Sequence, residues 1–177
     1  MKLELKHLAP YLSYGLKGIY NRAYNPETCS IIGVVFTKNP NDTRVRIKKD
    51  RVGYSESVFI GSIKPILHPL SDLTKEIEHN GEKFVPIIRL LELKYSKHVN
   101  EHDVSSADRE TKTSQYPSLC RAWFRFTAPK DIIVHIDAIL QEPYNIMQKL
   151  FEWKIDVFNL IPSGLAISYN DIKTKQA

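Results

Sequence analysis

The stretch TRVRIKKDRV, residues 43–52, limits the fold more than any other part of the chain because its apolar and charged residues alternate. Side chains of a β-strand point to opposite faces with a period of two. Val45 and Ile47 therefore share one face, and the cations Arg44, Arg46 and Lys48 share the other. This pattern predicts a half-buried strand with a cationic outer face, within a sheet that is covered on one side.

Neighbouring segments supply candidate partner strands. TCSIIGVVFTK, residues 28–38, is rich in β-branched residues and ends at the turn cluster NPND, which predicts a hairpin with a loop near residues 39–42. ESVFIGSIKPIL predicts a further strand, interrupted at Pro65. LCRAWFRFT, residues 119–127, alternates in the same way as the basic strand, and DIIVHID, residues 131–137, is its candidate partner.

Three segments predict helices. The first spans residues 71–80, with Gly81 placed where a left-handed residue ends a helix. The second spans residues 86–95 and begins at a proline, which suits the first helical position. The third spans residues 143–160, where apolar residues recur at helical spacing.

The length and composition are those of an ordinary globular protein. The 177 residues, 42% hydrophobic and 25% charged, are enough for one domain with a real core. We predict a single α+β domain over residues 1–177, with a mostly antiparallel sheet built from residues 28–66 and 119–137. About three helices cover one side of this sheet. The long polar segment at residues 95–118 is interpreted as a loop.

The two cysteines, Cys29 and Cys120, make neither a disulfide framework nor a zinc motif. We expect both to be buried free thiols. The N-terminal residues hold no signal-like apolar run, and no stretch has the length of a membrane span. These features predict a protein of a reducing cytoplasm. Its formal charge of +5 permits nucleic acid or an acidic protein as partner, without requiring either.

The basic strand is the first candidate binding site. Its cations attract phosphates with salt-dependent strength, because binding releases counterions. Such a face is often only solvated surface, and cations also protect edge strands from aggregation. The candidate set consists of Arg44, Arg46, Lys48, Lys49 and Arg51.

A second candidate binding site lies on residues 119–127. Arg121, Trp123 and Arg125 share one face of the expected strand, and an indole between two guanidiniums can stack a base while they hold its phosphates. The alternative is that a helix covers Trp123.

The stretch HVNEH, residues 98–102, fits the H-x-x-E-H pattern of zinc hydrolases. In that interpretation His98 and His102 bind the metal and Glu101 is the base. The pattern needs an apolar helix face and a third ligand, whereas these flanks are polar, so a solvated loop is the simpler interpretation. No phosphate-binding glycine loop and no recognisable nucleophile occur, and we predict no catalytic residue, no cofactor and no enzyme.

Three segments together resemble a family of small phage and prophage proteins of Bacteroidetes. They are LKHLAPYLSYGLK, IKPILHPLSDLTKEIEHNGEKFVP and QKLFEWKIDVFNLIPSGLAI, and they cover about a third of the chain. The resemblance implies a viral accessory protein in the cytoplasm of a bacterial host, and it brings no catalytic residues with it. Residues 20–60 and 93–142 look specific to this chain.

We therefore expect a non-enzymatic, phage-encoded protein that binds host nucleic-acid machinery. Most specifically, we expect an inhibitor of an RNA-guided, CRISPR-type defence nuclease, in contact with the guide RNA or with acidic patches of the nuclease. Two alternatives stay open. One is a direct DNA- or RNA-binding regulator of phage genes, and the other is a zinc-dependent hydrolase.

Overall fold

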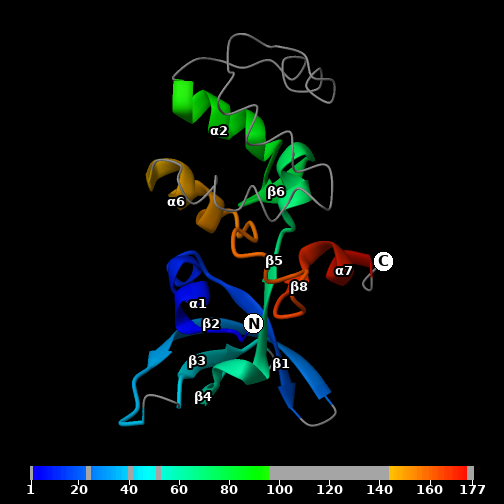
Figure 1. Cartoon of the computed structure of the whole chain (residues 1–177). Coiled ribbons are helices and arrows are strands. Elements are labelled where there is room, and N and C mark those ends of the chain that lie inside the picture. Colours follow the sequence, from blue (N-terminus) through cyan, green and yellow to red (C-terminus); the bar gives the residue numbers. More distant parts are fainter. Residues whose placement is uncertain (1, 23–24, 40–41, 51–52, 96–143, 175–177) are drawn as a thin grey trace. The chain divides into compact units, whose positions relative to one another are not determined.

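The computed structural model describes residues 2–22, 25–39, 42–50, 53–95 and 144–174, which form two compact units (Figure 1). Unit 1 consists of residues 1–68 and 158–177, and unit 2 of residues 69–157. Five of the six strands in the larger sheet pair antiparallel, so the predicted α+β class with a mostly antiparallel sheet is confirmed. One domain over residues 1–177 stays a prediction.

Unit 1 contains the six-stranded sheet, in the spatial order β4-β3-β2-β1-β5-β8. Its elements are α1 (Leu5–Leu12), β1 (Lys17–Arg22), β2 (Asn25–Val35), β3 (Arg44–Lys49), β4 (Ser55–Phe59), the 3-10 turn η1 (Ile60–Ser62), β5 (Ile63–Leu67), β8 (Ile167–Ser168) and α7 (Tyr169–Thr174). The predicted hairpin of the basic strand is confirmed, since β2 and β3 pair antiparallel.

Unit 2 contains a two-stranded sheet and two α-helices among its described residues. Its elements are the 3-10 turn η2 (Leu70–Thr74), β6 (Ile77–His79), β7 (Glu82–Phe84), α2 (Pro86–Tyr95) and α6 (Tyr144–Glu152). Helix α2 packs against both η2 and α6. No described helix, in either unit, is long and apolar enough to cross a membrane.

The link from β4 to β5 forces the sheet of unit 1 to curl. These strands stand first and fifth in the spatial order, which in a flat sheet would place them about 19 Å apart. Only the three residues of η1 join them, and a 3-10 helix advances about 2 Å per residue. A flat sheet cannot meet both conditions, so the strands curl into a barrel-like shape with an interior and a convex outer face.

Alternate residues of the curled strands fill the interior. Val45 and Ile47 of β3 are fully buried, as predicted, and Ile47 pairs with the buried Ile31 of β2. Helix α1 lies against β2 and adds Leu8 and Tyr11, both without exposed surface (Figure 1). Burying apolar side chains on one face of β3 fixes the other face toward solvent.

Strand β2 has one extra residue opposite β3. The register passes from Ile31–Ile47 to Gly33–Arg46, so Ile32 and Gly33 together oppose Arg46. A bulge of this kind absorbs a residue while the flanking side chains keep their faces. Ile32 is 48% exposed, which adds an apolar side chain to the surface beside Arg46.

The buried thiol of Cys29 lies in the interior of unit 1, as predicted. Its Sγ donates to the carbonyl oxygen of Gly18 at 3.5 Å. Burial, with a smaller contribution from the charge of Asp50, raises the pKa of Cys29 to about 11. Cys120 lies outside the described residues.

The raised pKa leads to a prediction about thiol reactivity. In Cys120→Ser protein, Cys29 should resist a thiol-specific reagent at neutral pH until the chain is unfolded, because the thiolate is the reactive form. Since the ordinary cysteine pKa is 9.0, the folded state should also lose stability as the pH rises from about 9 to about 11. Thiol titration of native and denatured protein measures the first effect. Stoichiometric labelling of the native protein would contradict it.

The predicted helix over residues 71–80 is wrong. The chain forms η2 and then the hairpin β6–β7, whose turn is Asn80-Gly81. Both turn residues have positive φ, 53° and 82°, as in the type I′ turn that Asn-Gly favours and that matches the twist of paired strands.

The predicted helix over residues 86–95 is confirmed as α2, but the one over residues 143–160 is confirmed only in its first half. Helix α6 ends because Lys154 adopts a left-handed conformation, with φ of 58°. The N–H of Lys154 donates to the carbonyl of Phe151, and the N–H of Ile155 donates to the carbonyl of Leu150. This Schellman pattern satisfies the last carbonyls and turns the chain out of the helix.

Two further expectations differ from the structure. Strand β5 runs through Pro65, which pairs with Gly18 of β1, so the predicted interruption falls earlier, in η1. The sequence left a short strand or one helical turn open around Leu3, Leu5 and Leu8, and the chain forms the helix α1 there, whereas α7 occurs where no helix was predicted. The expected strands over residues 119–137 lie outside the described residues.

Candidate functional site

Two neighbouring cations stand on the outer face of β3. Arg46 and Lys48 are both exposed, and no ion pair with another described residue is recorded for either side chain. The residues opposite them on β4 are Ser57 and Ser55. The predicted cationic face is therefore present here, with hydroxyl groups along one side.

Arg44 is held in place at the end of this row. Its Nε donates to Oδ1 of Asp42 at 2.8 Å, and its guanidinium carbon lies 4.5 Å from the ring centroid of Phe59. Phe59 is the residue opposite Arg44 on β4 and is 53% exposed. Neither contact is made by the two terminal amino groups of Arg44. These groups can donate a bidentate pair of hydrogen bonds to a phosphate.

A second acid, Asp50, lies beside this face in addition to Asp42. Asp50 accepts a hydrogen bond from Ser30 Oγ at 3.3 Å, and its other oxygen lies 3.7 Å from Nζ of Lys17. Lys17 and Ser30 are opposite residues of β1 and β2, and Ser30 is opposite Lys48. We define the outer cationic row as Arg44, Arg46 and Lys48, of which Arg46 and Lys48 have no recorded acidic partner among the described residues.

Lys49 does not belong to this row, so its assignment to the binding set is wrong. The period of two puts residue 49 on the inner face with Val45 and Ile47, and Lys49 is only 3% exposed. Its Nζ lies 2.9 Å from a carboxylate oxygen of Glu56 and 3.3 Å from one of Glu27.

Aromatic groups complete the surroundings of Lys49. Its Nζ donates to the hydroxyl of Tyr54 at 3.3 Å and lies 5.6 Å from the ring centroid of Tyr20. The contact with Glu56 is the main cause that raises the pKa of Lys49, against the opposing effect of burial. The two carboxylate oxygens nearest to Nζ are themselves buried, and Lys49 is the cation that both of them contact.

Several predicted site residues lie outside the described residues. They are Arg51, Arg121, Trp123 and Arg125 of the binding set, and His98, Glu101 and His102 of the zinc hypothesis. Within the described ranges, no group of three or more His, Cys, Asp and Glu side chains is arranged to hold a metal ion. The zinc hydrolase stays a prediction, and the metal content of protein purified without chelator tests it.

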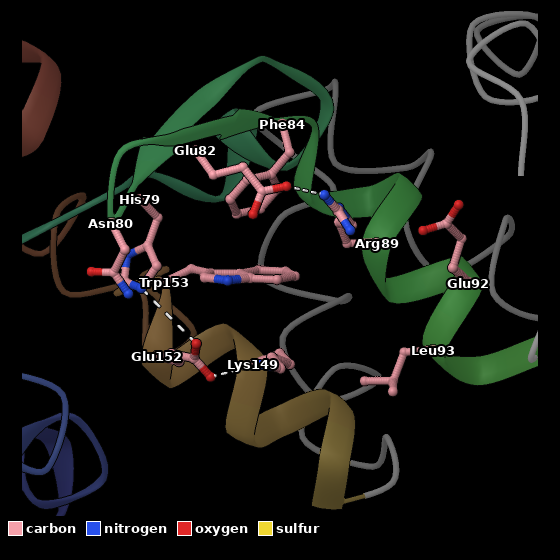
Figure 2. Close-up of a pocket in the computed structure, with 10 residues that line it drawn as sticks. All are labelled: His79, Asn80, Glu82, Phe84, Arg89, Glu92, Leu93, Lys149, Glu152 and Trp153. Atoms are coloured by element: carbon pink, nitrogen blue, oxygen red, sulfur yellow. Dashed lines mark hydrogen bonds and ion pairs between the residues drawn. The ribbon is translucent and has the colours of Figure 1, made fainter. Parts of the chain in front are cut away.

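Unit 2 contains a pocket that the sequence did not indicate, with a volume of about 380 Å³ (Figure 2). The hairpin β6–β7, helix α2 and the end of α6 form its walls. Trp153 lies in the middle of the view, and its ring centroid is 5.0 Å from that of Phe84, at an angle of 56°. A helix over residues 71–80 would not form the hairpin β6–β7, whose second strand carries Phe84.

Ion pairs connect charged side chains that line this pocket. Arg89 of α2 pairs with Glu82 of β7, and the Arg89 guanidinium carbon lies 5.7 Å from the ring centroid of Phe84. On the opposite wall, Lys149 lies 2.8 Å from Glu152, whose other oxygen is 4.0 Å from Nε2 of His79. The described lining contains no hydroxyl or thiol side chain.

Comparisons with protein-family models, with curated proteins and with solved structures found no match for this chain. The resemblance to phage and prophage proteins stays a prediction.

Proposed function

We propose that this protein is a non-enzymatic binding protein of a phage, and that its outer cationic row holds the phosphates of a nucleic acid within host machinery. The observation that carries the proposal is the pair Arg46 and Lys48, exposed side by side with no recorded acidic partner among the described residues. When a phosphate binds, it replaces the water contacts that the two cations lose. Binding also gains free energy because the nucleic acid releases its counterions.

The spacing of the row supports a phosphate backbone as ligand. Residues two apart on a strand are separated by about 6.8 Å, which is similar to the distance between neighbouring phosphates of an extended nucleic-acid strand. Arg44 is already fixed by Asp42 and Phe59, so little side-chain entropy remains to be lost on binding. The half-exposed Phe59 and Ile32 flank the cations and offer apolar contact to bases.

A more specific proposal follows from the resemblance to phage proteins. The nucleic acid is the guide RNA of an RNA-guided defence nuclease, and the protein inhibits that nuclease in the host cytoplasm. A guide-loaded complex combines phosphates with protein surface, and a face that mixes cations, serines and apolar side chains suits both.

The salt dependence of binding tests the role of the row. We expect Arg46→Ala/Lys48→Ala to weaken binding to single-stranded RNA and to reduce the slope of log affinity against log salt by about 1.4, since two phosphate contacts are lost. Fluorescence anisotropy over a salt series measures both effects. Lys75→Ala/Lys83→Ala is the matched control, because it removes two exposed lysines of unit 2. Equal slopes for the two double variants would contradict the proposal.

Affinity purification from the host, with and without RNase, tests the partner. Recovery of a defence nuclease with the wild-type chain, but not with Arg46→Ala/Lys48→Ala, supports the inhibitor. Recovery of nucleic acid alone supports the direct regulator instead. Recovery of only ribosomal or virion proteins would overturn the proposed function.

A further inference from the structure

We propose that a hollow of unit 1, called here the Phe59 hollow, holds the terminal nucleotide of a single strand that lies along the outer cationic row. This inference rests on the proposed function and adds to it a preference for strand ends. The hollow has a volume of about 770 Å³, within the range of small-molecule sites, about 300–1,000 Å³. The N-terminal segment, the end of β4, η1 and the start of β5 supply most of its described lining.

Phe59 connects this hollow to the outer cationic row. It is opposite Arg44 in the pairing of β3 with β4, and it also lines the hollow. Thr43, directly before β3, lines the hollow as well, and its carbonyl oxygen accepts a hydrogen bond of 3.1 Å from the N–H of Ile60. A strand that follows the row from Lys48 to Arg44 therefore reaches the hollow at Phe59.

The apolar part of the lining suits an unpaired base. Phe59 is 53% exposed even though the guanidinium of Arg44 lies over its ring, so part of the side chain is open to a ligand. Leu3, Ile60 and Ile63 add apolar groups to the same lining. A base of a single strand can stack on an aromatic ring, whereas the bases of a duplex are stacked and paired with each other.

The charges of the lining suit a terminal phosphate. Lys2 and Lys64 line the hollow, and no ion pair with another described residue is recorded for either side chain. The carboxylate of the described lining belongs to Glu4, whose Oε2 lies 3.0 Å from Nζ of Lys6, a cation outside the hollow. A terminal phosphate monoester carries nearly two negative charges at neutral pH, and an internal phosphate carries one. Two lysines match the terminal group better.

Competition between linear and circular RNA of one sequence tests the preference for ends. Each RNA displaces a labelled strand in fluorescence anisotropy, and only the linear form has a terminal nucleotide. We expect linear RNA with a terminal phosphate to bind at least about fivefold more tightly than circular RNA, the smallest usual gain from stacking one base on an aromatic ring. Linear RNAs that carry the phosphate at the 5′ or the 3′ end show which terminus is held.

A lysine of the hollow and a lysine outside it form a matched pair of variants. Lys64→Gln should weaken the binding of phosphorylated linear RNA about two- to fivefold, the effect of one half-exposed charge contact, and should leave unphosphorylated linear RNA unaffected. Lys173→Gln is the control, because Lys173 is an exposed lysine of unit 1 outside the hollow. Phe59→Leu should reduce the advantage of both linear RNAs over circular RNA. Thermal melts verify that each variant is folded.

The outcomes separate the terminal site from the proposed function. Equal binding of linear and circular RNA, with the salt slope still reduced in Arg46→Ala/Lys48→Ala, would overturn the terminal site and leave the row intact. If that salt slope instead equals the slope of Lys75→Ala/Lys83→Ala, the proposed function fails, and a linear preference that Lys64→Gln removes would support a terminal site without the row. AMP that binds with the same dependence on Lys64, while linear and circular RNA bind equally, would identify a free nucleotide as the occupant and overturn the strand end.

Discussion

Lys49→Met is expected to cause the largest loss of stability among single substitutions of charged residues in unit 1. The change leaves the carboxylates of Glu27 and Glu56 facing each other beside a buried apolar chain, without the ammonium that both contact. Removing one partner of a buried ionic cluster costs more than the cluster itself contributes. Thermal unfolding followed by circular dichroism measures the effect as a marked decrease in melting temperature.

The neighbouring residue provides the control for this prediction. Lys48→Met removes the same group one position earlier on β3, but from the exposed face, and should change the melting temperature little. Adding Glu27→Gln and Glu56→Gln to Lys49→Met should restore much of the lost stability, because no uncompensated charge remains. Equal melting temperatures for Lys48→Met and Lys49→Met would show that the cluster has no such role.

The cluster also has a defined pH dependence. The folded-state pKa of Lys49 is above the ordinary lysine value of 10.5, so the folded chain binds this proton more tightly than the unfolded chain. The stabilisation is therefore complete at neutral pH. It is lost only as the pH rises above about 10.5 toward the folded-state value.

Gly18→Ala is the second substitution with a large expected effect. A Cβ at Gly18 would lie 3.0 Å from the carbonyl oxygen of Lys64 and 3.0 Å from Cγ2 of Ile63. Lys64 belongs to β5, which pairs with β1 at this point, so its backbone cannot move without breaking the ladder. Overpacking of this kind costs about 1–3 kcal/mol, which urea-induced unfolding can measure.

Gly33→Ala is the matched control, because a Cβ there meets no atom within 4 Å. Gly33 also lies in the same sheet, so the change in strand propensity is comparable for both positions. The two variants should therefore differ in unfolding free energy by about the overpacking cost alone. Similar unfolding free energies would mean that β1 and β5 can separate at Gly18 without cost.

The alternation of apolar and charged residues was enough to predict β3, its hairpin with β2 and the exposure of Arg46 and Lys48. The same rule places Lys49 inward, and the error there came from treating a run of cations as one surface. A run of like charges in a strand is divided between two faces, so only every second residue can contribute to a binding surface.

Two local features of unit 2 differ from the expectation because of backbone conformation. A glycine after a helical pattern can end a helix, but the Asn80-Gly81 pair is also a strong hairpin signal, and here the chain forms the hairpin. The end of α6 at Lys154 has no signal in residue type, because a lysine in a left-handed conformation is uncommon.

The pocket of unit 2 lies beyond sequence reasoning for a different reason. Phe84 of β7 and Trp153, which follows α6, are far apart in the chain and meet only through tertiary packing. Strand β1 is similar, since KGIYNR has no clear alternation and forms a strand because β2 and β5 both pair with it. Pairing between distant segments overrides weak local preference.

The three-residue turn η1 has a consequence for the cooperativity of unit 1. A terminal strand of a sheet ordinarily frays, and its amide hydrogens then exchange with solvent before those of the central strands. Here β4 is joined without slack to β5, which pairs with β1, so detaching β4 from β3 strains the pairing of β5 with β1. The outer cationic row lies on β3, beside β4, so we expect its amide hydrogens to exchange only with the global unfolding of the unit.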